Sequence, residues 1–183
     1  DSFIEEHIDE IKYNGIIKSR KALDKYVGLK RDEMEKTPQV IKCDGIEYKS
    51  TLWNEFMLKK VEAMRWAMED TGKGVYFSDS DLCYFAPLLN IKNPKYKMLV
   101  SPHYIRPDYE EKFGFYNVGF LWTNDISMLD MWYKETMTST YFEQKSLEPV
   151  VEHYKKTDSV LYADINVNYG WWRLLDGRKP ANE

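Results

Sequence analysis

The chain has 183 residues, enough to bury the core of one domain, and a formal net charge of −4. Aromatic residues make up 15% of it, which excludes intrinsic disorder. Charges are spread without long blocks of one sign, so no nucleic-acid partner is indicated. There is no apolar run of about 18 residues and no signal-peptide pattern. The two cysteines, Cys43 and Cys83, lack CxxC spacing. We therefore expect one cytoplasmic domain over residues 1–183, with no transmembrane segment and with free thiols.

The chain divides into a charged segment, residues 1–38, and a core, residues 39–183. The isoleucines of the first segment recur at spacings of four and three, which is typical of a narrow apolar helix stripe. We expect helices there, ended by Pro38. Residues 39–49 alternate apolar and polar positions around Asp44-Gly45, a dipeptide that favours a tight turn. A small β-hairpin is predicted at that point.

Residues 51–70 show the clearest helical pattern. Ser50 or Thr51 can cap its start and Gly72 can end it. Its apolar stripe consists of Trp53, Phe56, Met57, Val61, Met64, Ala67 and Met68. Lys60 lies inside this stripe, so its side chain either extends to the surface or meets an anion.

A short apolar run, residues 75–77, leads into two carboxylates at spacing i, i+2, Asp79 and Asp81. Side chains two apart on a strand share a face, and two like charges that close are costly unless a cation lies between them. Mg²⁺ and Mn²⁺ favour carboxylate ligands and keep open positions for phosphates. The alternative is an exposed turn, where Asp and Ser are ordinary residues.

Beyond this pair, strands and helices alternate irregularly. Strands are predicted at 97–100, 115–122 and 160–163, helices at 127–137 and 141–156, and a polar loop at 105–114. Gly119 interrupts a strand, which often marks close approach of a ligand or another backbone. Ser127 and Asp130 have capping-box spacing, and Pro149 breaks or kinks the last helix. This alternation predicts an α/β fold with a mixed central sheet flanked by helices.

Three ordered segments resemble the nucleotide-sugar glycosyltransferases of the GT-A fold, in particular the glycogenin and galactosyltransferase-like branch, family 8. They are a DxD strand ending in Asp79-Ser80-Asp81, an Asn-x-Gly strand at residues 117–119, and an acid-Gln-x-x-Leu helix starting at Glu143-Gln144. The resemblance covers residues 59–172. It implies a GT-A enzyme that moves a sugar from a nucleotide-diphosphate sugar, with a UDP-sugar favoured, to a glycan or other hydroxyl acceptor.

The resemblance also implies roles around the donor diphosphate. Asp79 and Asp81 would hold Mn²⁺ or Mg²⁺, and the cation would offset the charge of the departing nucleoside diphosphate. The residue between them, Ser80, would lie near the donor ribose. Lys60 falls near a basic residue that contacts donor phosphate in such enzymes.

Further roles concern the donor sugar. Asn117 and Gly119 match the strand that lines the sugar pocket, and Gln144 matches a glutamine below the anomeric carbon in retaining members. Glu143 stands beside it as a second catalytic candidate, although an acid can also simply begin a helix. Trp171 can stack on a sugar ring or close the core.

Two features depart from the family 8 pattern. Only 78 residues precede Asp79, and the first are expected to be helical, so the strand that cradles the nucleoside base is not evident. Three explanations stay open: the chain is a fragment, it omits disordered residues, or it is an unusual variant. Base recognition would be incomplete if the strand is absent. No histidine follows His153 to match the family's late third metal ligand; Asn168 is the nearest match and His103 the alternative. Retention or inversion stays open.

Two other functions remain open. The acid pair also resembles the nucleophile loop of haloacid-dehalogenase-type phosphatases, DxDx[TV], but Cys83 occupies the fifth position and no later acidic pair follows an apolar strand. A non-catalytic carbohydrate-binding or assembly module is the other alternative, supported by the abundance of aromatic residues. The ordered triple of motifs favours the glycosyltransferase.

Overall fold

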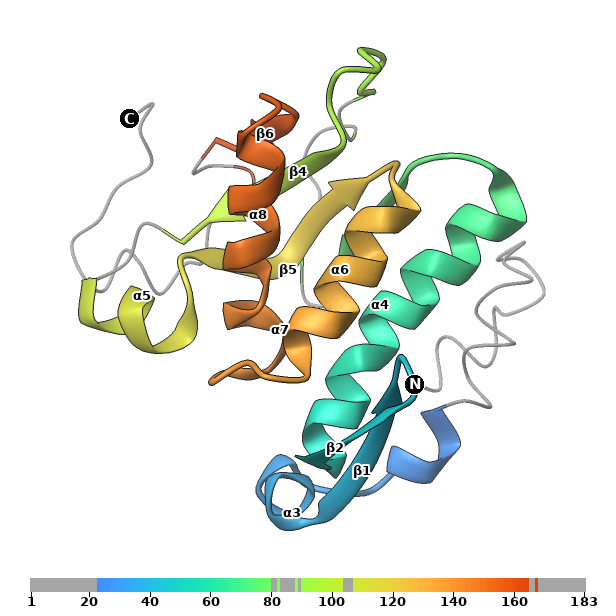
Figure 1. Ribbon diagram of the computed structural model, residues 1–183, viewed down its shortest axis with the longest axis vertical. Helices are drawn as coiled ribbons and strands as arrows, with labels where there is room; N and C mark the ends of the chain where they lie inside the picture. The colour runs from blue at the N-terminus through green and yellow to red at the C-terminus, as the bar shows by residue number, and fades with distance from the viewer. Residues whose placement is uncertain are drawn as a thin grey trace.

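The computed structural model describes residues 23–79, 82, 88, 90–103, 107–164 and 167 (Figure 1). The strands of this part are β1 (Pro38–Cys43), β2 (Ile46–Thr51), β3 (Val75–Ser78), β4 (Met98–Pro102), β5 (Tyr116–Thr123) and β6 (Val160–Tyr162). The helices are α3 (Arg31–Lys36), α4 (Leu52–Thr71), α5 (Pro107–Phe113), α6 (Ile126–Thr136), α7 (Phe142–Lys145) and α8 (Leu147–Lys155), preceded by a 3-10 turn, η1 (Asp24–Tyr26).

The central sheet has the strand order β3-β5-β4-β6. Strand β5 runs antiparallel to β3 and β4, whereas β4 and β6 are parallel, so the sheet is mixed. The expected fold class, α/β with a mixed sheet and flanking helices, is confirmed. Between β4 and β5 the register shifts, because Val100 pairs with Leu121 but Ser101 pairs with Asn117. Residues 118–120 of β5 therefore have no partner on β4 and form a bulge on that side of the strand. Such bulges are common next to functional sites.

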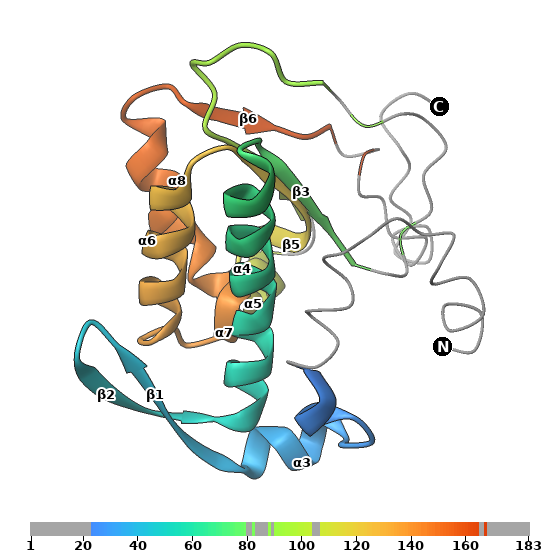
Figure 2. The ribbon, with the colours of Figure 1, turned by 90° about the vertical axis from the view of Figure 1, so that its right-hand side faces the viewer.

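Helices α4, α6 and α8 lie on one face of this sheet (Figure 2). The main core lies between these helices and the sheet. It includes Val61, Met64, Met98, Val100, Leu121, Leu129, Trp132, Val150 and Val151. A smaller cluster on other strand residues contains Leu99, Phe120, Trp122 and Ala163. Apolar side chains from distant segments thus hold the sheet and helices together. None of the helices described is both long and apolar enough to span a membrane.

The local predictions at the hairpin and at α4 are confirmed. Strands β1 and β2 form the hairpin, and Asp44 and Gly45 at its turn both have positive φ, 50° and 77°. Of the two candidate caps, Thr51 is the N-cap of α4, because its side chain accepts a hydrogen bond from the Asn54 N–H. Gly72 ends the helix in the left-handed conformation. Cys43 is a free thiol.

Three local predictions were wrong. The segment expected to be a polar loop, residues 105–114, contains helix α5. The predicted helix 141–156 divides at Ser146 into α7 and α8, and Pro149 lies in the first turn of α8, where backbone N–H groups need no partner within the helix. The side chain that caps α6 belongs to Asp125, which accepts a hydrogen bond from the Ser127 N–H.

The charged first segment is described only from residue 23 onward. There, η1 and α3 are short helices separated by a turn at residues 27–28, and α3 ends at Lys36, just before Pro38 opens β1. The expectation of helices therefore holds for α3. Residues 1–22 lie outside the described part.

Gly72→Ala tests the C-terminal cap of α4. Gly72 has φ +63°, and a Cβ there would meet nothing within 4 Å, so the substitution changes only backbone energy. We expect the free energy of unfolding to fall by about 1 kcal/mol in urea titrations followed by circular dichroism. The control is Glu69→Ala at an exposed position of the same last turn, expected to change it by less than about 0.5 kcal/mol. An equal decrease in the free energy of unfolding for the two variants would contradict the assignment of Gly72 as the C-terminal cap of α4.

Candidate functional site

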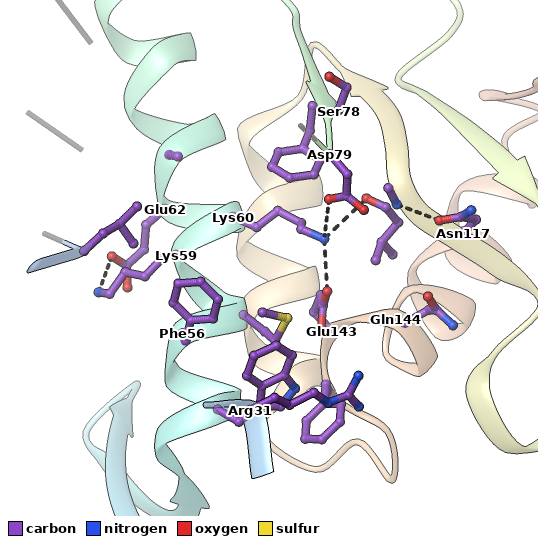
Figure 3. A pocket seen from close by; sticks show the side chains of 18 of the residues that line it. Arg31, Phe56, Lys59, Lys60, Glu62, Ser78, Asp79, Asn117, Glu143 and Gln144 are labelled. Atoms are coloured by element: carbon purple, nitrogen blue, oxygen red, sulfur yellow. Dashed lines mark hydrogen bonds and ion pairs between the residues drawn. The ribbon is translucent and has the colours of Figure 1, made fainter. Parts of the chain in front are cut away.

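A pocket of about 840 Å³ is bounded by the start of α3, α4, the C-terminal end of β3, the first half of β5 and α7 (Figure 3). This volume lies in the upper part of the ~300–1,000 Å³ range that is usual for small-molecule sites. In Figure 3 the polar side chains of Asp79 and Asn117 lie at one end, and Arg31 lies at the other, with Lys60 and Glu143 between them. The pocket thus joins five of the described elements, most of them distant from one another in the sequence.

Six of the predicted site residues line this one pocket: Lys60, Asp79, Asn117, Gly119, Glu143 and Gln144. They belong to α4, to the position directly after β3, to β5 and to α7. Three other predicted residues, Ser80, Asp81 and Trp171, lie outside the described residues. The segments singled out by their sequence pattern are therefore brought together wherever the structure describes them.

Lys60 is at the centre of the pocket, where its ammonium meets several acceptors. Its Nζ lies 3.1 Å from Glu143 Oε1, 3.7 Å from Asp79 Oδ1 and 3.5 Å from the Val118 carbonyl oxygen. It also lies 4.6 Å from the centre of the Phe77 ring, which adds a cation–π contact. The side chain is only 11% exposed. Of the two possibilities left open by the sequence, the lysine meets anions, and these belong to the protein.

Glu143 is a buried acid, with 6% of its side chain exposed. Burying an isolated carboxylate is costly, and Lys60 supplies the opposite charge. The backbone of Glu143 is held as firmly, since its carbonyl oxygen accepts hydrogen bonds from Trp132 Nε1 at 2.7 Å and from Ser146 Oγ at 2.9 Å. Glu143 lies in the first turn of α7, where an acid can simply begin a helix. Its carboxylate also forms an ion pair with Lys60.

Gly119 sets the position of the Asp79 carboxylate. The Asp79 N–H donates to the Gly119 carbonyl, and the Gly119 N–H donates to Asn117 Oδ1, both at 2.8 Å. A Cβ on Gly119 would lie 2.6 Å from Asp79 Oδ2, closer than real Cβ contacts. The glycine in this strand therefore allows a close approach, as its position predicted, and the approaching group is Asp79.

Gln144 and Phe142 show how α7 is fixed. Gln144 Nε2 donates to the Phe113 carbonyl at the end of α5, at 2.8 Å, which orients the amide. Phe142, immediately before Glu143, has φ +42°. A positive φ is rare for a bulky residue and is maintained only where surrounding contacts impose it, often at functional sites.

The far end of the pocket contains residues that the sequence did not indicate. The Arg31 guanidinium lies 4.9 Å from the Trp53 ring centre and 5.9 Å from that of Phe142. Its Nη2 donates to the Tyr141 hydroxyl at 3.4 Å, and its Nε donates to Glu35 at 2.7 Å. These two bonds raise the pKa of Arg31 above its ordinary value. Trp53 belonged to a predicted apolar stripe, whereas no local pattern marks Arg31.

Asp79 is the described carboxylate best placed to take a cation, because half of its side chain is exposed while Lys60 neutralises Glu143. Among the described residues no three His, Cys, Asp or Glu side chains form a metal-binding group. His103, the alternative third ligand, is not among the described residues that line the pocket. Asp81 and Asn168 fall outside the described part.

Comparisons of the chain with protein-family models, curated proteins and solved structures find no match.

Lys60→Met tests the buried ion pair, because it removes the charge opposite Glu143 but keeps a flexible side chain. Leaving a buried charge unpaired typically costs about 3–5 kcal/mol, so we expect the free energy of unfolding to fall by about 3 kcal/mol at pH 7 in urea titrations. Adding Glu143→Gln removes the stranded charge and should restore at least half of the loss.

The matched control is Lys59→Met. This neighbouring lysine pairs with Glu62, whose side chain is 43% exposed, and surface pairs contribute at most about 1 kcal/mol. If Lys60→Met lowers the free energy of unfolding no more than Lys59→Met does, the Lys60–Glu143 pair does not stabilise the fold.

Proposed function

We propose that this chain contains a metal-dependent glycosyltransferase site of the GT-A type, which moves a sugar from a nucleotide-diphosphate sugar to a hydroxyl acceptor. The observation that carries the proposal is the convergence of Asp79, of Asn117 with Gly119, and of Glu143 with Gln144 on one pocket. Each of these three groups was selected from local sequence pattern. They come from three different places in the fold: the residue after β3, strand β5 and helix α7. Chance matches to three short motifs would not be expected to share one pocket.

The charged residues of the pocket suit a diphosphate leaving group. Asp79, with Asp81 two residues later, offers carboxylate oxygens of the kind that Mn²⁺ and Mg²⁺ prefer. A bound cation would offset negative charge on the departing nucleoside diphosphate. Lys60 places a fixed ammonium 3.7 Å from Asp79, where it would attract the same phosphates in a partly dry site.

Neutral polar groups beside these charges suit a sugar. The amides of Asn117 and Gln144 line the pocket, and such groups fix a ligand's orientation through hydrogen bonds to its hydroxyls. Gly119, which has no Cβ, lets the Asp79 carboxylate lie against β5 at this point of the pocket. Glu143, bound to Lys60 at 3.1 Å, would act by holding that ammonium beside Asp79. In this proposal Glu143 is a positioning residue, and Gln144 remains the catalytic candidate.

The proposal is tested by thermal unfolding of the full chain with Mn²⁺ and UDP-, GDP- or dTDP-sugars. A ligand at about 100 times its Kd stabilises the folded state by about 2.7 kcal/mol, or roughly 5–10 °C for a domain of this size. We expect one donor and Mn²⁺ to raise Tm together, and Asp79→Asn or Asp81→Asn to abolish the joint shift. Asp158→Asn, which removes an exposed acid paired with Lys95, should keep it.

Donor hydrolysis, measured in the same samples, separates the alternatives. Joint binding with release of the nucleoside diphosphate supports the transferase. Joint binding without turnover would indicate a non-catalytic module. No shift with any donor and Mn²⁺, or a shift that survives Asp79→Asn, would overturn the proposed site.

A further inference from the structure

The end of the pocket opposite Asp79 combines flat apolar rings with hydrogen-bond donors. Trp53 and Phe142 meet edge to face, with ring centres 6.1 Å apart, and Tyr141 stacks at a tilt against Phe142 at 4.9 Å. The Arg31 guanidinium lies over both the Trp53 and the Phe142 rings. Its side chain is 53% exposed, so this end is open rather than closed core.

Each group at this end is held in place before any ligand arrives. Arg31 is anchored to Glu35 and Tyr141, yet a guanidinium has five N–H groups and these two bonds use only two of them. Phe142 keeps its positive φ between its aromatic neighbours. A wall with fixed rings and unused donors is suited to a ligand with both an apolar face and hydroxyls.

From this geometry we infer that Arg31, Trp53, Tyr141 and Phe142 form a saccharide-binding subsite that receives the acceptor of the proposed transferase, an inference that rests on that function. A pyranose ring has an apolar C–H face, which would stack on the part of the Trp53 or Phe142 ring that Arg31 does not cover. Its edge carries hydroxyls, which the remaining N–H groups of Arg31 and the Tyr141 hydroxyl would bind.

The location of the subsite fits an acceptor. Trp53 and Lys60 lie seven residues apart on α4, which corresponds to about 10 Å along the helix axis. This separation accommodates a sugar ring at Trp53 whose next ring or hydroxyl extends toward the donor end at Lys60 and Asp79. Both ends line the same pocket, so no barrier of described residues has to move between them.

Saccharide binding is tested without any donor, by saturation-transfer NMR of the full chain with lactose, maltose, cellobiose and chitobiose. We expect at least one disaccharide to bind, and Trp53→Leu to weaken its binding about tenfold, because the stacking surface is lost. Trp53→Phe retains an aromatic face and should recover most of the affinity, which shows that the effect is not caused by misfolding.

Arg31→Gln tests the donors of the subsite and has a matched control. We expect it to weaken disaccharide binding about threefold to tenfold. Arg65→Gln removes another ion-paired arginine, which contacts Asp130 on α6 and does not belong to the described lining of this pocket; it should leave disaccharide binding unchanged.

The outcomes separate this inference from the proposed function. Disaccharide binding that depends on Trp53, with no donor binding or turnover, supports the subsite and overturns the transferase. Donor turnover with none of the four disaccharides bound overturns the subsite alone. If Trp53→Leu weakens binding of the donor with Mn²⁺ instead, this end holds the nucleoside base, which also overturns the acceptor assignment.

Discussion

The contact on which the structure most depends is the buried ion pair between Lys60 and Glu143. It joins α4 to α7, and through Asp79 and the Val118 carbonyl the same ammonium reaches the end of β3 and the bulge of β5. Neither charge can lose its partner without a large desolvation cost. Four of the five elements around the pocket, all except α3, are therefore connected at one atom, Lys60 Nζ. The interaction that shapes the site also resists separation of these elements.

The parts of the fold that could be predicted from sequence are those decided by neighbouring residues. The Asp44-Gly45 turn and the caps of α4 depend on side chains and backbone angles within a few positions. The break in the helical segment 141–156 was expected at Pro149 but lies at Ser146, and its position depends on contacts with distant residues. Gln144 bonds to the Phe113 carbonyl, and Glu148 accepts from the Phe115 N–H at 2.8 Å, so the chain from α7 to α8 is fixed by a segment some thirty residues earlier. No local pattern contains that information.

The residues of the candidate site also fall into two groups: those that a local sequence pattern indicates and those that only distant contacts reveal. Asp79, Asn117, Gly119 and Gln144 could be selected because short motifs carry them, and Lys60 stood out as a charge within an apolar stripe. Its partner could not be named, since the pairing of Lys60 with Glu143 spans 83 positions. The arginine at the other end was missed for the same reason: its importance arises from contacts with Trp53, Tyr141 and Phe142, made across three helices and the residue before α7.

The charges also suggest an order of events for the proposed reaction. Asp79 and Glu143 contribute two negative charges and Lys60 one positive charge, which leaves one net negative charge at the half-exposed Asp79. Asp81 adds another negative charge nearby in the sequence. A diphosphate approaching this group alone would be repelled, whereas a divalent cation would be attracted. Because Glu143 retains Lys60 through the shorter contact, 3.1 Å against 3.7 Å, a cation can take over Asp79 without leaving the lysine unpaired. The cation should then precede or accompany the donor.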